Sequence, residues 1–154
     1  MKRIYAIDAW CIGCRRCEVA CKAFHSNSKD VVKAFKVQTP SPQNRVRVEG
    51  DLSYSIAVNC RHCEKPKCIE GCISGAMTKD PSTGLVSSDP VKCVGCRTCV
   101  SMCPFGAVRI EEGPVKEIAF KCDLCSDGTG QPGKPSCVSA CPNNALIYIE
   151  SEVA

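Results

Sequence analysis

The stretch that decides the fold is Cys11-Ile12-Gly13-Cys14-Arg15-Arg16-Cys17, which is followed by Cys21. A second copy runs Cys93-Val94-Gly95-Cys96-Arg97-Thr98-Cys99 and is followed by Cys103 and Pro104. Both copies space their cysteines as C-x2-C-x2-C-x3-C. This near-identity indicates an internal repeat, and the rest of the chain is organised around it.

Two further groups complete a set of four groups of four cysteines. The second group has the spacing C-x2-C-x4-C-x3-C, and the fourth has an eleven-residue insert between its second and third cysteines and ends before Pro142. All 16 cysteines of the 154-residue chain fall into these groups, so none is left over. In chain order the groups are Cys11, Cys14, Cys17 and Cys21; Cys60, Cys63, Cys68 and Cys72; Cys93, Cys96, Cys99 and Cys103; and Cys122, Cys125, Cys137 and Cys141.

The spacing of the first and third groups is that of a [4Fe–4S] cluster site. Three cysteines separated by two residues wrap a tight loop around one face of a cuboidal cluster, and Gly13 and Gly95 allow the turn without a Cβ clash. The fourth cysteine lies one helical turn beyond the third, on the same helix face. It therefore points away from its own loop and binds the second cluster of a pair.

Disulfides and zinc are the alternatives for so many cysteines. The 44% hydrophobic share includes the cysteines, so the ordinary apolar core is small and bound groups must help to hold the fold. Secreted scaffolds use disulfides for that purpose, whereas cysteine clusters in cytoplasmic proteins bind metal. Structural zinc prefers two pairs of ligands with a longer spacer between them. The first three groups are compact and end in C-x3-C, which favours iron–sulfur clusters.

The lack of long apolar segments predicts a cytoplasmic protein. Residues 1–8 include two basic residues but neither an apolar run of signal-peptide length nor a twin-arginine signal. No stretch approaches the roughly 18 apolar residues of a membrane helix, so we expect no direct membrane span. Export together with a signal-bearing partner would leave the same sequence, and this alternative stays open.

Each cysteine group is expected to form a unit of short strand, cysteine loop, helix of one or two turns, and return strand. Alternation and β-branched content predict the strands Lys2–Asp8, Ser53–Asn59, Leu85–Ser88, Val108–Glu111, Val115–Phe120 and Leu146–Glu150. Gly113-Pro114 predicts a turn. The connections 26–49 and 126–136 are predicted to be loops or partner-facing excursions.

The formal net charge of +4 raises the question of a nucleic-acid partner. That count treats cysteine as neutral, whereas a [4Fe–4S] core with four thiolates contributes about −2. Four such sites bring the chain to about −4, so the basic residues act as counter-charge and we expect no nucleic-acid partner. A basic side chain next to a ligand cysteine would raise the reduction potential of the cluster. The alternative for such a residue is a solvated position on the surface. The basic residues next to ligand cysteines are Arg15, Arg16, Arg61 and Arg97.

Other neighbours of the cysteines are expected to support the clusters. Histidine replaces cysteine at some iron sites, but the cysteines are complete in fours, so His25 and His62 are expected beside a ligand or at the surface. Trp10 and Tyr5 are expected to pack around the cluster of the first group. The apolar residues expected to shield clusters from water are Ile12, Ile73, Ala76, Val94 and Ala107.

The whole pattern resembles the four-cluster ferredoxin-type electron-transfer subunits of molybdenum- and tungsten-pterin oxidoreductases, formate dehydrogenases, hydrogenases and carbon monoxide dehydrogenase. The resemblance covers Asp8 to Glu150 and includes Cys60-Arg61-His62-Cys63-Glu64-Lys65-Pro66-Lys67-Cys68, which is similar to the family's second motif. Lys22 and Ile73 stand where ferredoxins often have proline, a residue that shapes the chain rather than binding iron. The continuation Cys72-Ile73-Ser74-Gly75-Ala76-Met77, without that proline, is more like the short cytoplasmic members.

This resemblance implies an α+β fold of two ferredoxin-like modules related by pseudo-symmetry, with short strands and short helices packed round four [4Fe–4S] clusters. The outer module comprises residues 1–50 and 104–154, and the inner module comprises residues 51–103. Four ligand sets are implied, each with three cysteines of one group and the fourth cysteine of another. They are set A, Cys11, Cys14, Cys17 and Cys141; set B, Cys122, Cys125, Cys137 and Cys21; set C, Cys60, Cys63, Cys68 and Cys103; and set D, Cys93, Cys96, Cys99 and Cys72.

The resemblance also implies an electron-transfer subunit without catalytic residues of its own. The sequence contains no nucleophile–base motif and no phosphate-binding glycine loop. Four clusters would carry single electrons between a catalytic oxidoreductase subunit and a second redox protein, namely a ferredoxin, a flavin protein or a hydrogenase subunit. A higher oligomer is compatible with this role.

Three other functions compete with this one. They are a free-standing soluble polyferredoxin, a zinc-binding structural adaptor, and an iron–sulfur enzyme with an open iron site. Complete sets of four cysteines argue against the last, since an open iron site needs a missing ligand.

Overall fold

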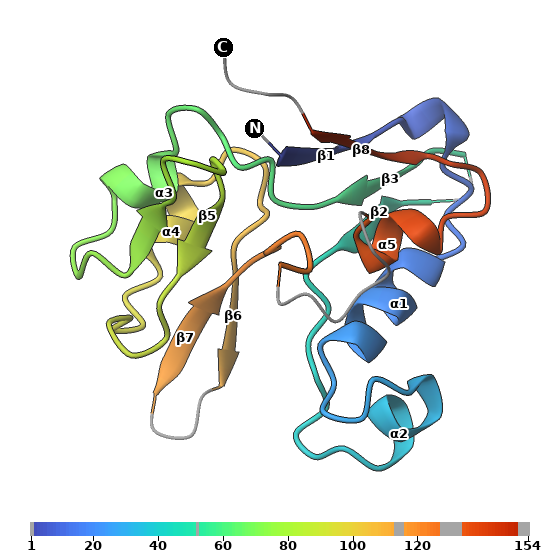
Figure 1. Ribbon diagram of the computed structural model, residues 1–154, viewed down its shortest axis with the longest axis horizontal. Helices are drawn as coiled ribbons and strands as arrows, with labels where there is room; N and C mark the ends of the chain where they lie inside the picture. The colour runs from blue at the N-terminus through green and yellow to red at the C-terminus, as the bar shows by residue number, and fades with distance from the viewer. Residues whose placement is uncertain (1, 52, 113–115, 127–133, 151–154) are drawn as a thin grey trace.

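The structure is a computed structural model that describes residues 2–51, 53–112, 116–126 and 134–150 (Figure 1). Within these ranges the strands form four separate two-stranded antiparallel sheets, and the helices are short. The expected α+β class is confirmed. The predicted Gly113-Pro114 turn and most of the insert of the fourth cysteine group lie outside the described residues.

The two ends of the described chain pair with each other. Strand β1 (Lys2–Ala6) runs antiparallel to β8 (Leu146–Glu150), with Ile4 opposite Tyr148. A short 3-10 helix, η1 (Asp8–Trp10), leads from β1 into the first cysteine loop. Helix α1 (Arg16–Phe24) then packs against α5 (Ser136–Ser139), and Figure 1 shows both beside the β1–β8 pair. The first and fourth cysteine groups are thereby brought together.

The segment 26–49 is not the plain loop that the sequence predicts. It contains helix α2 (Val31–Lys36), whose first turn is capped by Asp30, because the Asp30 carboxylate accepts a hydrogen bond from the Lys33 backbone N–H at 2.8 Å. The fully buried Ala34 anchors α2, which lies against α1. Strand β2 (Arg47–Gly50) follows and pairs with β3 (Ser55–Val58).

The second and third cysteine groups form the other half of the described structure. Helices α3 (Lys67–Glu70) and α4 (Thr98–Met102) pack together, and the strands β4 (Met77–Lys79) and β5 (Val86–Ser88) form a hairpin beside them. A further hairpin of β6 (Arg109–Glu112) and β7 (Glu117–Phe120) reaches back toward this half, as Figure 1 shows.

Two buried clusters of apolar side chains and cysteines make up the core. The first combines Ile4, Val48, Ala57 and Leu146 with cysteines of the first, second and fourth groups. The second combines apolar residues of β4 to β7 with cysteines of the second and third groups. Cysteine sulfurs thus occupy the positions that large aliphatic side chains hold in ordinary cores, as the small apolar share of the sequence requires.

The predicted strands are present, but most are shorter than predicted. Only Leu146–Glu150 has the predicted bounds. The residue before β7 that the prediction included, Val115, lies outside the described part. No residue range was predicted for β2 or β4, although β4 lies where the expected unit places its return strand. None of the described helices is long and apolar enough to cross a membrane.

Candidate iron–sulfur sites

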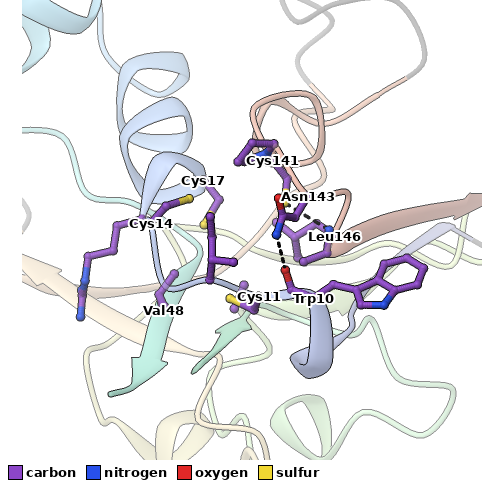
Figure 2. Close-up of a pocket in the computed structure, with 13 residues that line it drawn as sticks. Trp10, Cys11, Cys14, Cys17, Val48, Cys141, Asn143 and Leu146 are labelled. Atoms are coloured by element: carbon purple, nitrogen blue, oxygen red, sulfur yellow. Dashed lines mark hydrogen bonds between the residues drawn. The ribbon is translucent and has the colours of Figure 1, made fainter. Parts of the chain in front are cut away.

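The cysteines of set A line one pocket. Cys11, Cys14 and Cys17 come from the loop before α1 and from its first turn, and Cys141 comes from the segment just after α5 (Figure 2). The pocket wall includes the side chains of Trp10, Val48, Ala57 and Leu146. Asn143 closes one side, because its amide donates a hydrogen bond to the Trp10 carbonyl oxygen at 3.3 Å.

The cysteines of sets C and D line two more pockets. All four of set C face one pocket, together with Arg61, Phe105 and Val86. All four of set D face another, together with Val94, Met77 and Ala119. In each pocket one cysteine belongs to the other sequence group. Cys103, just after α4, joins the pocket of set C, and Cys72, just after α3, joins the pocket of set D.

The cysteines of set B gather where α1 meets α5. Cys122 and Cys137 are buried. Burial raises the pKa of the Cys137 thiol, and the charges of the nearby Cys122, Cys21 and Cys125 raise it further. The Cys125 thiol lies 3.6 Å from the Ser136 hydroxyl at the start of α5. Cys21, from the second turn of α1, therefore meets three cysteines that lie more than 100 positions further along the chain.

Each cysteine loop turns at a residue with positive φ immediately before its second cysteine. Gly13 and Gly95 occupy this position with φ of +66° and +71°, as predicted. His62 and Leu124 occupy it in the other two groups, with φ of 45° and 59°. A side chain in this conformation costs backbone energy, so the loop geometry is imposed here by the surrounding packing.

A shared turn follows the fourth cysteine in three of the four groups. Gly75, Gly106 and Asn144 hold its positive-φ position, and the backbone N–H of each donates to the carbonyl oxygen of the fourth cysteine. A backbone N–H shortly after that residue then donates to the cysteine sulfur. These donors are Met77 to Cys72 at 3.4 Å, Ala107 to Cys103 at 3.4 Å, and Ala145 to Cys141 at 3.2 Å.

This turn explains two features of the sequence. The matching stretches 74–77, 105–108 and 143–146 contain the turn and lead into the strand after it, β4, β6 or β8. Ile73 takes the place of proline without disturbing the turn, since Gly75 still donates to the Cys72 carbonyl oxygen at 3.2 Å. Hydrogen bonds to ligand sulfur are one means by which proteins set cluster potentials.

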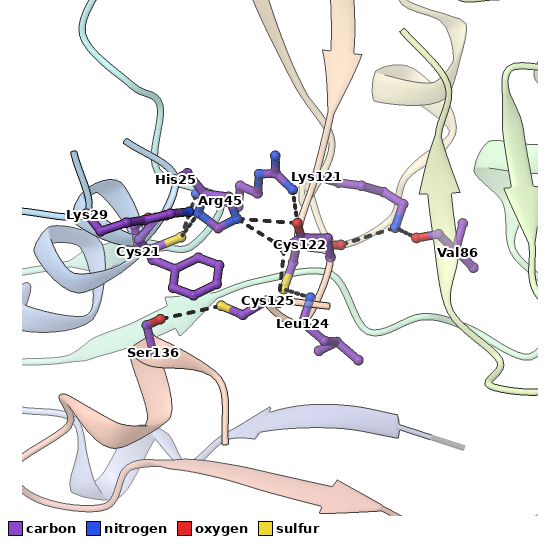
Figure 3. A network of polar contacts seen from close by, with 12 residues as sticks. Cys21, His25, Lys29, Arg45, Val86, Lys121, Cys122, Leu124, Cys125 and Ser136 are labelled. Atoms are coloured by element: carbon purple, nitrogen blue, oxygen red, sulfur yellow. Dashed lines mark hydrogen bonds and ion pairs between the residues drawn. The ribbon is translucent and has the colours of Figure 1, made fainter. Parts of the chain in front are cut away.

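The first group departs from this pattern because α1 continues past Cys21 to Phe24. The sulfur of Cys21 instead accepts a hydrogen bond from the Arg45 backbone N–H at 3.1 Å, supplied by the long excursion after α2. His25 lies beside it, with Nδ1 2.8 Å from the Cys21 carbonyl oxygen and Nε2 3.2 Å from Asp123 (Figure 3). Asp123 also pairs with the Arg45 guanidinium.

Several of the cysteine thiols are buried where a thiolate is unfavourable without a bound metal cation. Burial raises the pKa of the Cys17 thiol to about 12 and that of Cys68 to about 11. Burial likewise raises the pKa of Cys122 and of Cys137. A thiolate in such a place needs a bound cation, and the iron of a cluster supplies it when it takes the thiolate as a ligand.

Most of the arginines predicted to sit against clusters turn outward. Arg15 is exposed and pairs with Glu18 at 3.4 Å, and Arg97 is exposed and pairs with Glu117. Arg16 is exposed as well. Even so, Arg15, Arg61 and Arg97 line the pockets of sets A, C and D, and the Arg61 guanidinium lies 4.2 Å from the centre of the Phe105 ring. The cation that lies directly on cysteine sulfur is Lys121, which sequence reasoning missed.

The remaining predicted neighbours are divided between core and surface. His62 is fully buried, so a surface position is wrong for it. Trp10 lines the pocket of set A, whereas Tyr5 is 43% exposed and does not line that pocket. Ala76 and Ala107 are buried as expected for a shield. Ile12 and Val94 line the pockets of sets A and D although each is more than half exposed, whereas Ile73 is 78% exposed.

Comparison with known proteins identifies the family. Residues 52–151 match the 4Fe-4S dicluster domain. This chain belongs to the 4Fe-4S dicluster family. The electron transport protein HydN of Escherichia coli strain K12 is 37% identical over 164 residues, which cover 97% of this chain and 89% of HydN. The B subunit of anaerobic dimethyl sulfoxide reductase from the same strain is 36% identical, covering 90% of this chain and 68% of that protein.

A solved structure shares the fold. The matching protein from the active site complex BamBC of benzoyl coenzyme A reductase superimposes with a TM-score of 0.52 and is 26% identical, covering 100% of this chain and 81% of that one. With 16 cysteines in a 4Fe-4S dicluster family member, the cofactors are four [4Fe–4S] clusters. The protein is therefore an iron–sulfur electron-transfer protein.

Proposed function

We propose that this chain is the electron-transfer subunit of an oxidoreductase complex, with its clusters held by cysteine sets A to D and without catalytic residues of its own. When bound, such clusters supply one-electron oxidation and reduction. The chain itself binds them, sets their spacing and shields them from water. The observation that supports the proposal is that the cysteines of sets A, C and D each line a pocket of their own, while those of set B lie where α1 meets α5. This arrangement would place the four clusters in a row.

The row is built by the short helices. Helix α1 carries Cys17 of set A and Cys21 of set B, and α5 carries Cys137 of set B just before Cys141 of set A. Helices α3 and α4 link sets C and D in the same manner. Between the two pairs, Cys60 of set C and Cys122 of set B lie in the same buried cluster, and Lys121 donates hydrogen bonds to both residues. These links support the order A, B, C, D.

The exposure of one cysteine at each end of the row supports electron entry at one end and electron exit at the other. Cys14 of set A and Cys96 of set D are the two exposed cysteines of the sixteen. Exposed apolar side chains adjoin both: Ile12 is 63% exposed beside Cys14, and Val94 is 56% exposed beside Cys96. A partner that covers these apolar patches would exclude water from the terminal clusters and bring its own redox centre close.

The partners we propose are a catalytic subunit at one end and a second redox protein at the other. Two similar proteins, a subunit of dimethyl sulfoxide reductase and a protein of an active site complex of benzoyl coenzyme A reductase, support a catalytic partner. Among catalytic partners we favour a tungsten or molybdenum aldehyde or formate enzyme, a carbon monoxide dehydrogenase or a hydrogenase. We further propose a cytoplasmic location and two modules, residues 1–50 with 104–154 and residues 51–103.

The experiment is a multi-element analysis of the native complex, isolated anaerobically through a tag on this chain. About 16 iron atoms per chain are expected, four for each of four clusters. Tungsten or molybdenum in the same sample would identify a pterin enzyme, whereas nickel would indicate carbon monoxide dehydrogenase or hydrogenase. A tagged chain in which the four cysteines of one group are serine serves as the matched control for iron content.

Two outcomes would overturn the proposal. Recovery of the chain alone with about 16 iron atoms would favour a free-standing polyferredoxin that meets its partners only briefly. Recovery with about four zinc ions and little iron would leave a zinc-stabilised structural adaptor.

A further inference from the structure

Lys121 lies at the junction between sets B and C. It is 4% exposed, although lysine is rarely buried in proteins. Its ammonium donates to the sulfur of Cys60 in set C at 3.4 Å and to the carbonyl oxygen of Cys122 in set B at 3.4 Å. A third hydrogen bond goes to the carbonyl oxygen of Val86 in β5, as Figure 3 shows together with the contact to Cys122.

These three contacts define the charge of the side chain. A lysine ammonium has three N–H donors and no acceptor, and all three atoms around Nζ of Lys121 are acceptors. The neighbouring His62 is fully buried and carries no charge, since its Nδ1 accepts a hydrogen bond from the Val86 backbone N–H at 3.0 Å. Burial and the nearby Lys121 cation both lower the pKa of His62, to about 3.

A buried cation is costly unless negative charge compensates it. The contacts of Lys121 include two neutral carbonyl groups and one cysteine sulfur, and no carboxylate hydrogen-bonds to it within the described ranges. Clusters on sets B and C would each bring a net charge of about −2. The compensation for Lys121 is therefore the pair of clusters on either side of it.

We propose that Lys121 is a positioning residue that raises the reduction potentials of the clusters on sets B and C together. This inference rests on the ligand sets of the proposed function. A fixed cation stabilises the added electron of a reduced cluster, and low dielectric surroundings strengthen the effect. Because Lys121 contacts both sets, it acts on the two central clusters of the row and leaves the terminal ones less affected.

The test replaces Lys121 in the complete, cluster-loaded protein and measures each cluster by redox titration with electron paramagnetic resonance. Lys121→Gln keeps a hydrogen-bond donor without the charge, and Lys121→Met keeps the length without either. At the wild-type midpoint of each central cluster, both variants are expected to lower the reduced-to-oxidised ratio about tenfold or more, which is about 59 mV for one electron. The signals of sets B and C are assigned with Cys125→Ser and Cys63→Ser.

Lys36→Met is the matched control, because Lys36 is an exposed lysine of α2. It is expected to leave all four potentials unchanged. Unchanged central potentials in Lys121→Gln and Lys121→Met, with about 16 irons still bound, would overturn this inference and leave the proposed function standing. An equal shift of all four clusters would also overturn it, since a local cation acts on its neighbours. Low iron in the wild-type protein would instead contradict the proposed function.

A second measurement does not depend on how well the neutral variants assemble. Wild-type protein labelled with 15N at the lysine side chain is reduced and examined by pulsed electron paramagnetic resonance. A 15N coupling is expected on the cluster bound through Cys60, and Lys121→Arg, which keeps a cation but carries no lysine label, is expected to abolish it. Absence of the coupling in the wild-type protein would overturn the placement of Lys121 against that cluster.

Discussion

Nε2 of His25 lies 3.2 Å from the Asp123 carboxylate, although the two residues are 98 positions apart in the chain. The other ring nitrogen of His25 lies 2.8 Å from the Cys21 carbonyl oxygen. Asp123 follows Cys122 directly, so the histidine joins the end of α1 to the loop of the fourth cysteine group. This contact holds Cys21 next to the three other cysteines of set B.

Asp123→Ala is expected to weaken set B selectively. The change removes the acceptor of His25 and of Arg45 and leaves two partly buried donors unpaired, at a cost of about 1.5–3 kcal/mol per hydrogen bond to a charged group. The rate at which a chelator removes iron from the anaerobic protein measures the effect. Glu70→Ala, at an exposed carboxylate of α3, should release iron at the wild-type rate. Equal rates in the two variants would contradict the role of Asp123.

The same network predicts a pH dependence. Burial opposes the charged form of His25, but the hydrogen bonds to Asp123 and Cys21 outweigh it and raise the pKa from 6.5 to about 9. A group whose pKa is higher in the folded state stabilises the protein fully at pH values below its pKa in the unfolded state. This stabilisation is lost as the pH rises through its pKa in the folded state. The difference in unfolding temperature between wild type and His25→Gln should therefore shrink from pH 6.5 to above pH 9.

His62→Gln is the control for this titration. Burial and then the charge of Lys121 lower the pKa of His62 to about 3, so this histidine is neutral across that whole range. The unfolding-temperature difference between wild type and His62→Gln is expected to stay constant with pH. A constant difference for His25→Gln as well would show that the His25 contact does not depend on charge.

Two glycines allow a matched test of the cysteine loops. Gly95 and Gly75 both have positive φ, of +71° and +65°, so alanine strains the backbone by about 1–2 kcal/mol at either site. At Gly95 an added Cβ would also lie 2.8 Å from the Glu117 carbonyl oxygen, whereas at Gly75 it meets nothing within 4 Å. Gly95→Ala is therefore expected to destabilise the protein more than Gly75→Ala, and chemical unfolding of the loaded protein measures both. Equal losses of stability in the two variants would show that β7 moves away from the loop at little energetic cost.

Serine substitutions test the ligand sets directly. Cys11→Ser and Cys141→Ser should disturb the same signal in the electron paramagnetic resonance spectrum, because both belong to set A. Cys21→Ser should disturb a different signal, shared with Cys125→Ser, although Cys21 lies in the same sequence group as Cys11. If Cys21→Ser and Cys11→Ser altered one common signal instead, each group would bind its own cluster and the exchange of fourth cysteines would be wrong.

Sequence reasoning succeeded where the information is local. The loop glycines Gly13 and Gly95 turn with positive φ as predicted, and the strand Leu146–Glu150 has its predicted bounds. These features depend on residue type and on neighbours within a few positions. His62 and Leu124 were not recognised as residues of positive φ, because that conformation is uncommon for any residue other than glycine.

Several features that the sequence did not predict depend on residues that are far apart along the chain. Lys121 contacts Cys60 and Val86, which lie 61 and 35 positions away, so its neighbour Cys122 gave no hint of a buried cation. Helix α2 escaped notice because it is only six residues long and mostly exposed. The arginines beside ligands met both of the alternatives open to them, since Arg15 and Arg97 line the pockets of sets A and D and are also exposed, each paired with a glutamate.

The pairing of β1 with β8 has a consequence for how the protein is made. Strand β1 has no partner until residues 146–150 have been synthesised, and α1 waits for α5 in the same way. The helices α3 and α4, by contrast, are complete once Met102 has left the ribosome. Cofactor insertion into the growing polypeptide would thus begin in the middle of the protein, while the first cysteines to be translated would be among the last to receive iron.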